Sequence, residues 1–162
     1  MKTLKLFIMA FSFFGLLGCN SKKENSKQNS TLIAKQITIS ELGHELKLLA
    51  ENKTEFNFFG ITSNGIDCIY FVKNHNNFDI EFEAITSEQI PYLEKLNIFG
   101  KEEQYNVLHS SYGNKPHYPS DKSAPVIRLE TNSDINNTIK IATKIQSDIF
   151  NNNNETKYEV VP

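Results

Sequence analysis

Apolar and acidic side chains alternate between Phe78 and Ile85. One side of this segment carries Phe78, Ile80, Phe82 and Ala84, and the other carries Asp79, Glu81 and Glu83. Successive side chains of a strand point to opposite faces, so the alternation predicts a strand with one packed face and one face in water. An antiparallel sheet accommodates such a strand, because only one of its faces must be buried.

Two segments rich in aromatic and β-branched residues precede this strand, at 56–62 and 66–72. Asn64 and Gly65 lie between them, and Asn-Gly tolerates the positive φ angles of a type I′ turn, so we expect a tight hairpin. Segments 105–112 and 125–131 are predicted as a fourth and a fifth strand. Residues 157–161 could add a short strand at an edge of the sheet.

Three segments have the spacing of amphipathic helices instead. The first spans about 40–52, and the second spans about 87–99, with Pro91 in its first turn and Gly100 as its stop. The third follows a cap at Ser133 or Asp134 and carries an isoleucine-rich stripe that ends at Ile149. The predicted fold class is therefore α+β, in the order α-βββ-α-ββ-α, with three helices covering one or both faces of a mainly antiparallel sheet of about five strands.

The first residues have a different character from the rest of the chain. Lys2 and Lys5 precede an apolar run from Leu6 to Leu17, and the small residue Gly18 follows it. A basic start, a short apolar segment and a small residue are typical of a secretory signal peptide. A membrane-spanning helix needs about 20 apolar residues, and this run is shorter. We therefore expect residues 1–18 to be removed.

The residues around the expected cut, Leu16-Leu17-Gly18-Cys19, resemble the lipobox of bacterial lipoproteins. The resemblance covers only about the first 20 residues. It implies cleavage before Cys19, a diacylglyceryl group on the Cys19 thiol and, usually, acylation of the new amino terminus. Stable anchoring takes two or more acyl chains, which this modification would supply. The resemblance therefore implies attachment to a membrane of the cell envelope.

The residues after Cys19 are almost wholly polar for about a dozen positions, which predicts a disordered tether. We divide the chain into a signal peptide at 1–18, a lipid-anchored tether at 19–36 and one α+β domain at 37–162. Asn20 is not the Asp that some bacteria read as a signal for inner-membrane retention, which favours the outer membrane. The periplasmic and the surface-exposed side both stay open.

Charge and cysteine content narrow the possible functions. Removal of residues 1–18 takes away two lysines and no acidic residue, so the formal charge changes from −2 to −4. This acidity argues against nucleic acid as a partner, because nucleic-acid binding needs a basic surface. If Cys19 carries lipid, Cys68 is a lone thiol, and we expect it to be a buried strand residue.

No catalytic, cofactor or metal site is predicted. His75 and His109 are candidate bases for a Cys68 nucleophile, but Cys68 lies among apolar residues beside Asp67 and not in the electropositive setting of a reactive thiol. The pair His44-Glu45 starts like a zinc-protease motif, but its second helical histidine is missing.

Two surfaces are candidates for binding. The row Asp79, Glu81 and Glu83 could recognise a basic partner, and Arg128, the only arginine, is expected to pair with one of these carboxylates or with Glu130. The loop 113–122 carries His117 and Tyr118 between two prolines and Asp121 after them, and long loops often bind ligands.

The sequence thus favours an envelope lipoprotein with a small non-enzymatic binding domain. The alternatives are an immunity or inhibitor lipoprotein directed against a toxin or lytic enzyme, and a small hydrolase that uses Cys68 or a histidine of the loop.

Overall fold

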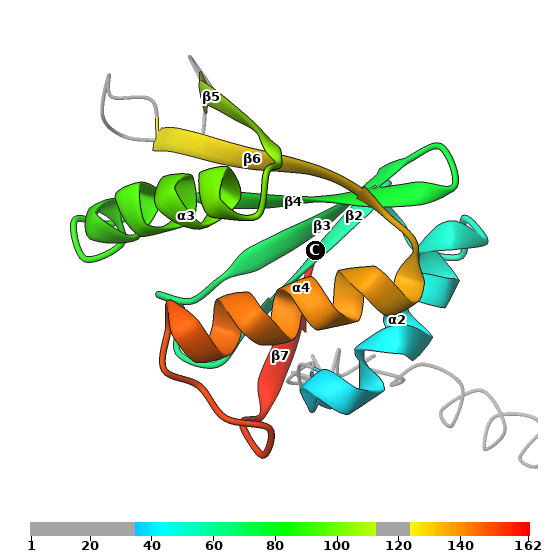
Figure 1. The fold of residues 1–162 in the computed structure, drawn as a ribbon. Helices are drawn as coiled ribbons and strands as arrows, with labels where there is room; N and C mark the ends of the chain where they lie inside the picture. Colours follow the sequence, from blue (N-terminus) through cyan, green and yellow to red (C-terminus); the bar gives the residue numbers. More distant parts are fainter. Residues whose placement is uncertain (1–34, 113–123) are drawn as a thin grey trace, which may run out of the picture. The chain divides into compact units, whose positions relative to one another are not determined.

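Antiparallel strands form one sheet in the computed structural model, which describes residues 35–112 and 124–162 (Figure 1). In this part of the chain the sheet has seven strands, in the order β1-β7-β2-β3-β4-β6-β5. The strands are β1 (Gln36–Ile37), β2 (Phe58–Thr62), β3 (Ile69–Asn74), β4 (Asn77–Glu83), β5 (Asn106–Tyr112), β6 (Ala124–Ser133) and β7 (Tyr158–Val161). Neighbours in this order are all antiparallel, so β5 and β1 lie at the two edges.

Three α-helices cover one face of this sheet (Figure 1). They are α2 (Leu42–Ala50), α3 (Ile90–Glu102) and α4 (Ile135–Asp148), and a short 3-10 turn, η1 (Ile39–Glu41), leads into α2. Helix α3 packs on β5 and β6, α4 packs on β4 and β6, and α2 packs on β3 and α4. The α+β class and the three helices are therefore confirmed. Within the described ranges, no helix is both long and apolar enough to cross a membrane.

The prediction of about five strands is wrong, because the sheet has seven in the described residues. The additional strands are β1 and β7, which pair with each other. β1 is only two residues long, too short to show an alternation in the sequence. β7 was expected at an edge of the sheet, but it lies between β1 and β2. Gln36, which the sequence places at the end of the tether, pairs with Glu159 of β7.

The hairpin of β2 and β3 is confirmed, but its turn is not the predicted type I′ turn. That turn needs positive φ at both central residues, and of Asn64 and Gly65 only Gly65 has it, with φ of 81°. The buried carboxylate of Asp67 organises a longer connection, residues 63–68, by accepting hydrogen bonds from Ser63 N at 2.8 Å and from Thr62 Oγ1 at 2.7 Å. Asn64 and Gly65 contribute to this connection, because Asn64 Oδ1 accepts a hydrogen bond of 2.8 Å from Ile66 N and Gly65 supplies the positive φ, but they do so around the Asp67 carboxylate and not as a two-residue turn.

Gly100 does not stop α3, which continues to Glu102. A Cβ atom on Gly100 would lie 2.6 Å from Val107 Cγ2 and 2.8 Å from Leu129 Cδ2, so this glycine lets the helix approach β5 and β6 closely. The helix ends instead through Gln104, which has φ of 62°, and through a hydrogen bond of 2.8 Å from Tyr105 N to Gly100 O.

The start of α4 follows its prediction. The Asp134 carboxylate accepts a hydrogen bond of 2.8 Å from Asn137 N, which makes Asp134 the N-cap. Ala142, Ile145 and Ile149 of the predicted stripe are buried in the core. The core thus lies between the three helices and one face of the sheet.

Candidate functional site

The second face of the sheet is covered by no helix in the described chain (Figure 1), and we call it the open face. Residues directly opposite each other on antiparallel strands share a face, so the register identifies its members. From β2, β3 and β7 these are Phe58, Gly60, Tyr70, Val72, Glu159 and Val161. From β4, β5 and β6 they are Glu81, Glu83, Asn106, Leu108, Ser110, Val126, Arg128 and Glu130, of which Val126 is buried.

Three aromatic side chains, Phe56, Phe58 and Tyr70, form what we call the aromatic row of the open face. The rings of Phe56 and Phe58 stack with centroids 5.5 Å apart, and Phe58 meets Tyr70 edge-on at 6.1 Å. The Tyr70 ring lies over Gly60, since a Cβ atom on that glycine would be 2.9 Å from two carbons of the ring. Phe56, at the outer end, is 44% exposed. The row is thus built on rigid strands and partly open to solvent.

The predicted acidic row is only partly a solvated surface. Asp79 was expected to face water, but it is 1% exposed. Its carboxylate accepts hydrogen bonds of 3.1 Å from Asn74 Nδ2 and from Asn132 N. The register of β4 against β6 shifts between Phe78 and Ile80, and this irregularity places Asp79 against the end of β6. Asp79 therefore stabilises the fold as a buried, hydrogen-bonded carboxylate, whereas Glu81 and Glu83 are half-buried on the open face.

Arg128 pairs with the acidic row, as expected. It lies opposite Glu81 in the register of β4 and β6, and its Nε is 2.6 Å from Glu81 Oε1. Glu130 accepts a hydrogen bond of 2.5 Å from Asn106 Nδ2 instead. On the open face, four carboxylates of described residues (Glu81, Glu83, Glu130 and Glu159) accompany the single guanidinium of Arg128. The described part of this face therefore has an acidic excess.

Cys68 is buried, as predicted, but it is not a strand residue, because it lies in the connection just before β3. Burial raises the pKa of its thiol to about 11, with a further contribution from the negative charge of Asp67. His75 Nδ1 is 2.9 Å from Asn74 Oδ1, and His109 Nε2 is 3.3 Å from Asn97 Oδ1. The thiol is thus held in its protonated form, and each of these two candidate bases already contacts an asparagine.

The other predicted site residues are not in the described part of the chain. His117, Tyr118 and Asp121 belong to the segment 113–123, and Gly18 and Cys19 precede residue 35. Their predicted roles stay predictions.

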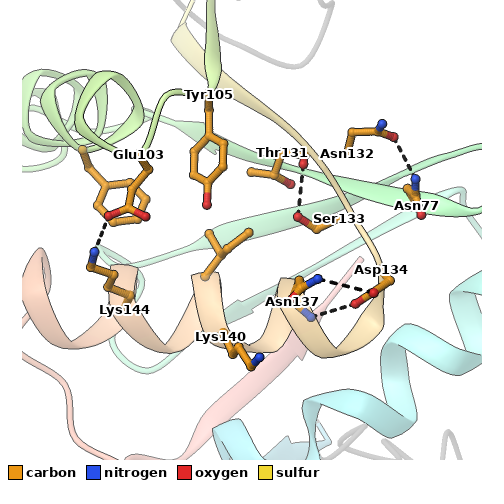
Figure 2. A pocket seen from close by; sticks show the side chains of 12 residues that line it. Asn77, Glu103, Tyr105, Thr131, Asn132, Ser133, Asp134, Asn137, Lys140 and Lys144 are labelled. Carbon is orange, nitrogen blue, oxygen red and sulfur yellow. Dashed lines mark hydrogen bonds and ion pairs between the residues drawn. The ribbon is translucent and has the colours of Figure 1, made fainter.

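A cleft of about 550 Å³ opens between α3 and α4, on the helical side of the sheet (Figure 2). We call it the α3–α4 cleft. Its apolar lining includes Phe99 and Ile141, and its polar lining comes from the ends of β4, β6 and α3 and from the first turns of α4. This volume lies in the range of pockets that bind small ligands. No sequence motif predicts the cleft, because its lining residues come from separate segments of the chain.

At one end of the cleft, a residue other than glycine has a positive φ angle. Asn132, just before α4, has φ of 43°, a conformation that is uncommon for a residue other than glycine. Its N–H donates to the buried carboxylate of Asp79, and its Oδ1 accepts a hydrogen bond of 2.9 Å from Asn77 Nδ2 (Figure 2). Backbone strain of this kind is often found at binding sites. Here the strand irregularity beside Asp79 and the asparagine pair fix the shape of the cleft together.

Tyr105 projects toward α4 across the other end of the cleft (Figure 2). Burial and the nearby carboxylate of Glu103 raise the pKa of its phenol, so the hydroxyl stays protonated at neutral pH. Glu103 itself forms an ion pair with Lys144 of α4, which connects the two helices at this end. Tyr105 thus offers the cleft a neutral hydroxyl group.

Comparisons with known proteins add no relative: no protein-family model, curated protein or solved structure matches this chain.

Proposed function

We propose that this chain is a lipid-anchored protein of the cell envelope whose domain binds a protein partner through the open face. Anchoring is proposed from the lipobox residues Leu16, Gly18 and Cys19, and the polar residues that follow would form the tether. The partner would approach the face that the helices leave uncovered in the described chain. Catalysis is not part of the proposal.

The observation that carries the proposal is the aromatic row. Exposed, mutually stacked aromatic side chains contribute large apolar area at low cost in conformational entropy, and such residues dominate the binding energy of many interfaces. The strands β2 and β3 hold Phe58 and Tyr70 in place before any partner arrives. Preorganisation of this kind reduces the entropy lost on binding.

The charges beside the aromatic row indicate what kind of partner fits. The exposed carboxylates of Glu130 and Glu159 favour a partner with a basic rim around an apolar centre. We expect the charges to affect mainly the association rate and its salt dependence. The aromatic row is expected to determine how slowly the complex dissociates.

Crosslinking followed by affinity capture tests this proposal in membranes that contain the full-length protein. We expect a specific partner whose capture decreases at least tenfold with Phe56→Ala. Ile98→Ala is the matched control, because Ile98 is 48% exposed on α3, compared with 44% for Phe56 on the open face. Equal capture by the two variants, or unchanged capture by a Glu130→Lys/Glu159→Lys double variant at two exposed positions, would contradict the proposed surface. A toxin or lytic enzyme as the captured partner would make the domain an inhibitor.

The anchor has a test of its own. With Cys19→Ser, we expect the protein to leave the membrane fraction, because no thiol at that position can accept lipid. Metabolic labelling with a fatty-acid analogue should label the wild type and not the variant. A wild type that takes up no label, or a variant that takes up as much as the wild type, would rule out lipid on Cys19 and leave the open-face proposal standing.

A further inference from the structure

The charged groups that line the α3–α4 cleft balance one another. Lys140 and Lys144 face Glu103 and Asp134, so the lining has two groups of each sign. Glu103 pairs with Lys144, and the Asp134 carboxylate is occupied as the N-cap of α4. A dedicated anion or cation site needs an excess of one sign. The cleft therefore favours a ligand without net charge.

Some polar groups of the cleft have donors or acceptors that form no hydrogen bond within the described chain, and these could bind such a ligand. The bond between Asn77 Nδ2 and Asn132 Oδ1 leaves Asn77 Oδ1 as an acceptor and Asn132 Nδ2 as a donor. Neither atom has a further hydrogen-bond partner among the described residues, and the same is true of the Tyr105 hydroxyl. Donors and acceptors thus stand at both ends of one cleft (Figure 2).

We propose that the α3–α4 cleft binds a neutral, hydroxyl-rich ligand, a saccharide. A sugar hydroxyl both donates and accepts, so it matches a cleft whose lining carries amide donors, amide acceptors and a phenol. The carbon–hydrogen face of a sugar ring is apolar, and the half-buried ring of Tyr105, which packs against the buried Phe99, gives it an apolar contact. Asp79 holds Asn132 in its binding conformation in advance.

This inference is independent of the proposed function, because the cleft and the aromatic row lie on opposite faces of the sheet. The test uses the full-length chain in a detergent without a sugar headgroup, titrated separately with maltotriose, cellotriose and chitotriose. The side-chain amide signals of asparagine are followed by NMR. We expect at least one trisaccharide to shift the signals of Asn77 and Asn132 in a saturable way, with a dissociation constant in the millimolar range.

Asn132→Gly removes the amide and suits the backbone, because glycine adopts positive φ without strain. We expect it to weaken saccharide binding about three- to tenfold, the effect of one lost hydrogen bond, without loss of thermal stability. Asn151→Gly is the matched control: Asn151 has φ of 60° and does not line the cleft, so binding should not change. Tyr105→Phe keeps the ring and removes only the hydroxyl, and should weaken binding to a similar extent.

The proposal fails if none of the three sugars shifts these signals, or if Asn132→Gly and Tyr105→Phe both bind the sugars as the wild type does. Inorganic phosphate is the competing probe. Phosphate that shifts the same signals and displaces the sugar would make the cleft an anion site and overturn the neutral-ligand proposal.

Discussion

The two faces of the sheet use the same strands for different purposes. In β3, Phe71 is fully buried under the helices, whereas its neighbour Tyr70 is half-buried on the open face. In β2, Phe59 and Phe58 divide in the same way. Each strand thus supplies core and surface alternately. The difference teaches that an aromatic residue in this sheet belongs to the core on one face and is partly exposed to solvent on the other.

The largest expected effect compares a phenylalanine on each side. Phe71→Ala should lower the free energy of unfolding by about 3–5 kcal/mol, because it opens a cavity in the core. Phe56→Ala should cost less than about 1 kcal/mol, since Phe56 is 44% exposed. Urea unfolding measures both values. A Phe56→Ala cost near that of Phe71→Ala would break the comparison and show that the aromatic row belongs to a second core.

A smaller effect on the free energy of unfolding is expected at Asp67, in the connection between β2 and β3. Burial alone would raise the pKa of this carboxyl, but hydrogen bonds from Ser63, Thr62 and Asn152 outweigh it and leave the pKa lowered. Asp67→Asn removes the charge that these donors surround, and should cost about 2–3 kcal/mol at pH 7.

The lowered pKa of Asp67 also sets a pH dependence. The stabilisation from this group is fully present above the ordinary aspartate value, about pH 4, and is lost as the pH falls through the lowered folded-state pKa. Urea midpoints at pH 7, 4 and 3 should therefore fall less steeply for Asp67→Asn than for the wild type. Glu55→Gln, at an exposed position, is the control. Parallel pH profiles of Asp67→Asn and the wild type would contradict this role.

Substitutions of two glycines, one under the helices and one on the open face, extend the comparison with smaller expected changes in the free energy of unfolding. Gly100→Ala should cost about 1–2 kcal/mol, because its Cβ meets Val107 and Leu129 in the packed layer and this strain exceeds the gain in helix propensity. Gly60→Ala meets the Tyr70 ring and Val161 Cγ2 at 2.9 Å, a wider approach than at Gly100, on the face that no helix covers in the described chain. We expect a cost below about 1 kcal/mol. Thermal unfolding of the two variants, measured in parallel, gives both costs. Equal costs would mean that side chains are packed as tightly on the open face as under the helices.

The smallest expected effect is a near absence of reaction at Cys68. With a thiol pKa of about 11, roughly one thiol in a thousand is ionised at pH 8, and the residue is buried as well. A thiol reagent should label the native protein slowly and the urea-unfolded protein within seconds. Fast labelling of the native state would indicate that the sheet opens at this position and would revive the nucleophile hypothesis.

Much of the fold could be predicted from periodicity. The helices, the strands β2 to β6 and the N-cap at Asp134 each have a local pattern, and the structure places them within a few residues of the expected positions. Patterns fail where a distant residue decides. The Asp67 carboxylate organises the connection that contains Asn64 and Gly65, the close approach of Val107 explains why a glycine stands inside α3 at position 100, and a register shift buries Asp79.

The candidate sites were less predictable than the fold. The pairing of Arg128 with the acidic row follows from charge and was expected, but the α3–α4 cleft depends on long-range geometry. Asn77 and Asn132 are 55 positions apart in the chain and meet only through the pairing of β4 with β6. Neither asparagine has a local sequence pattern that distinguishes it from the many others in this chain.

The pairing of β1 with β7 has a mechanical consequence. A force applied through the residues before Lys35 would enter the domain at β1, which is held by two residue pairs with β7, a hydrogen bond of 2.8 Å from Val160 N to Lys35 O, and the ion pair between Lys35 and Glu45 at 2.6 Å. These contacts would yield before the longer pairing of β4 with β6 or β5 with β6. Under tension the chain would thus release a short segment first, while the open face and the cleft keep their shape.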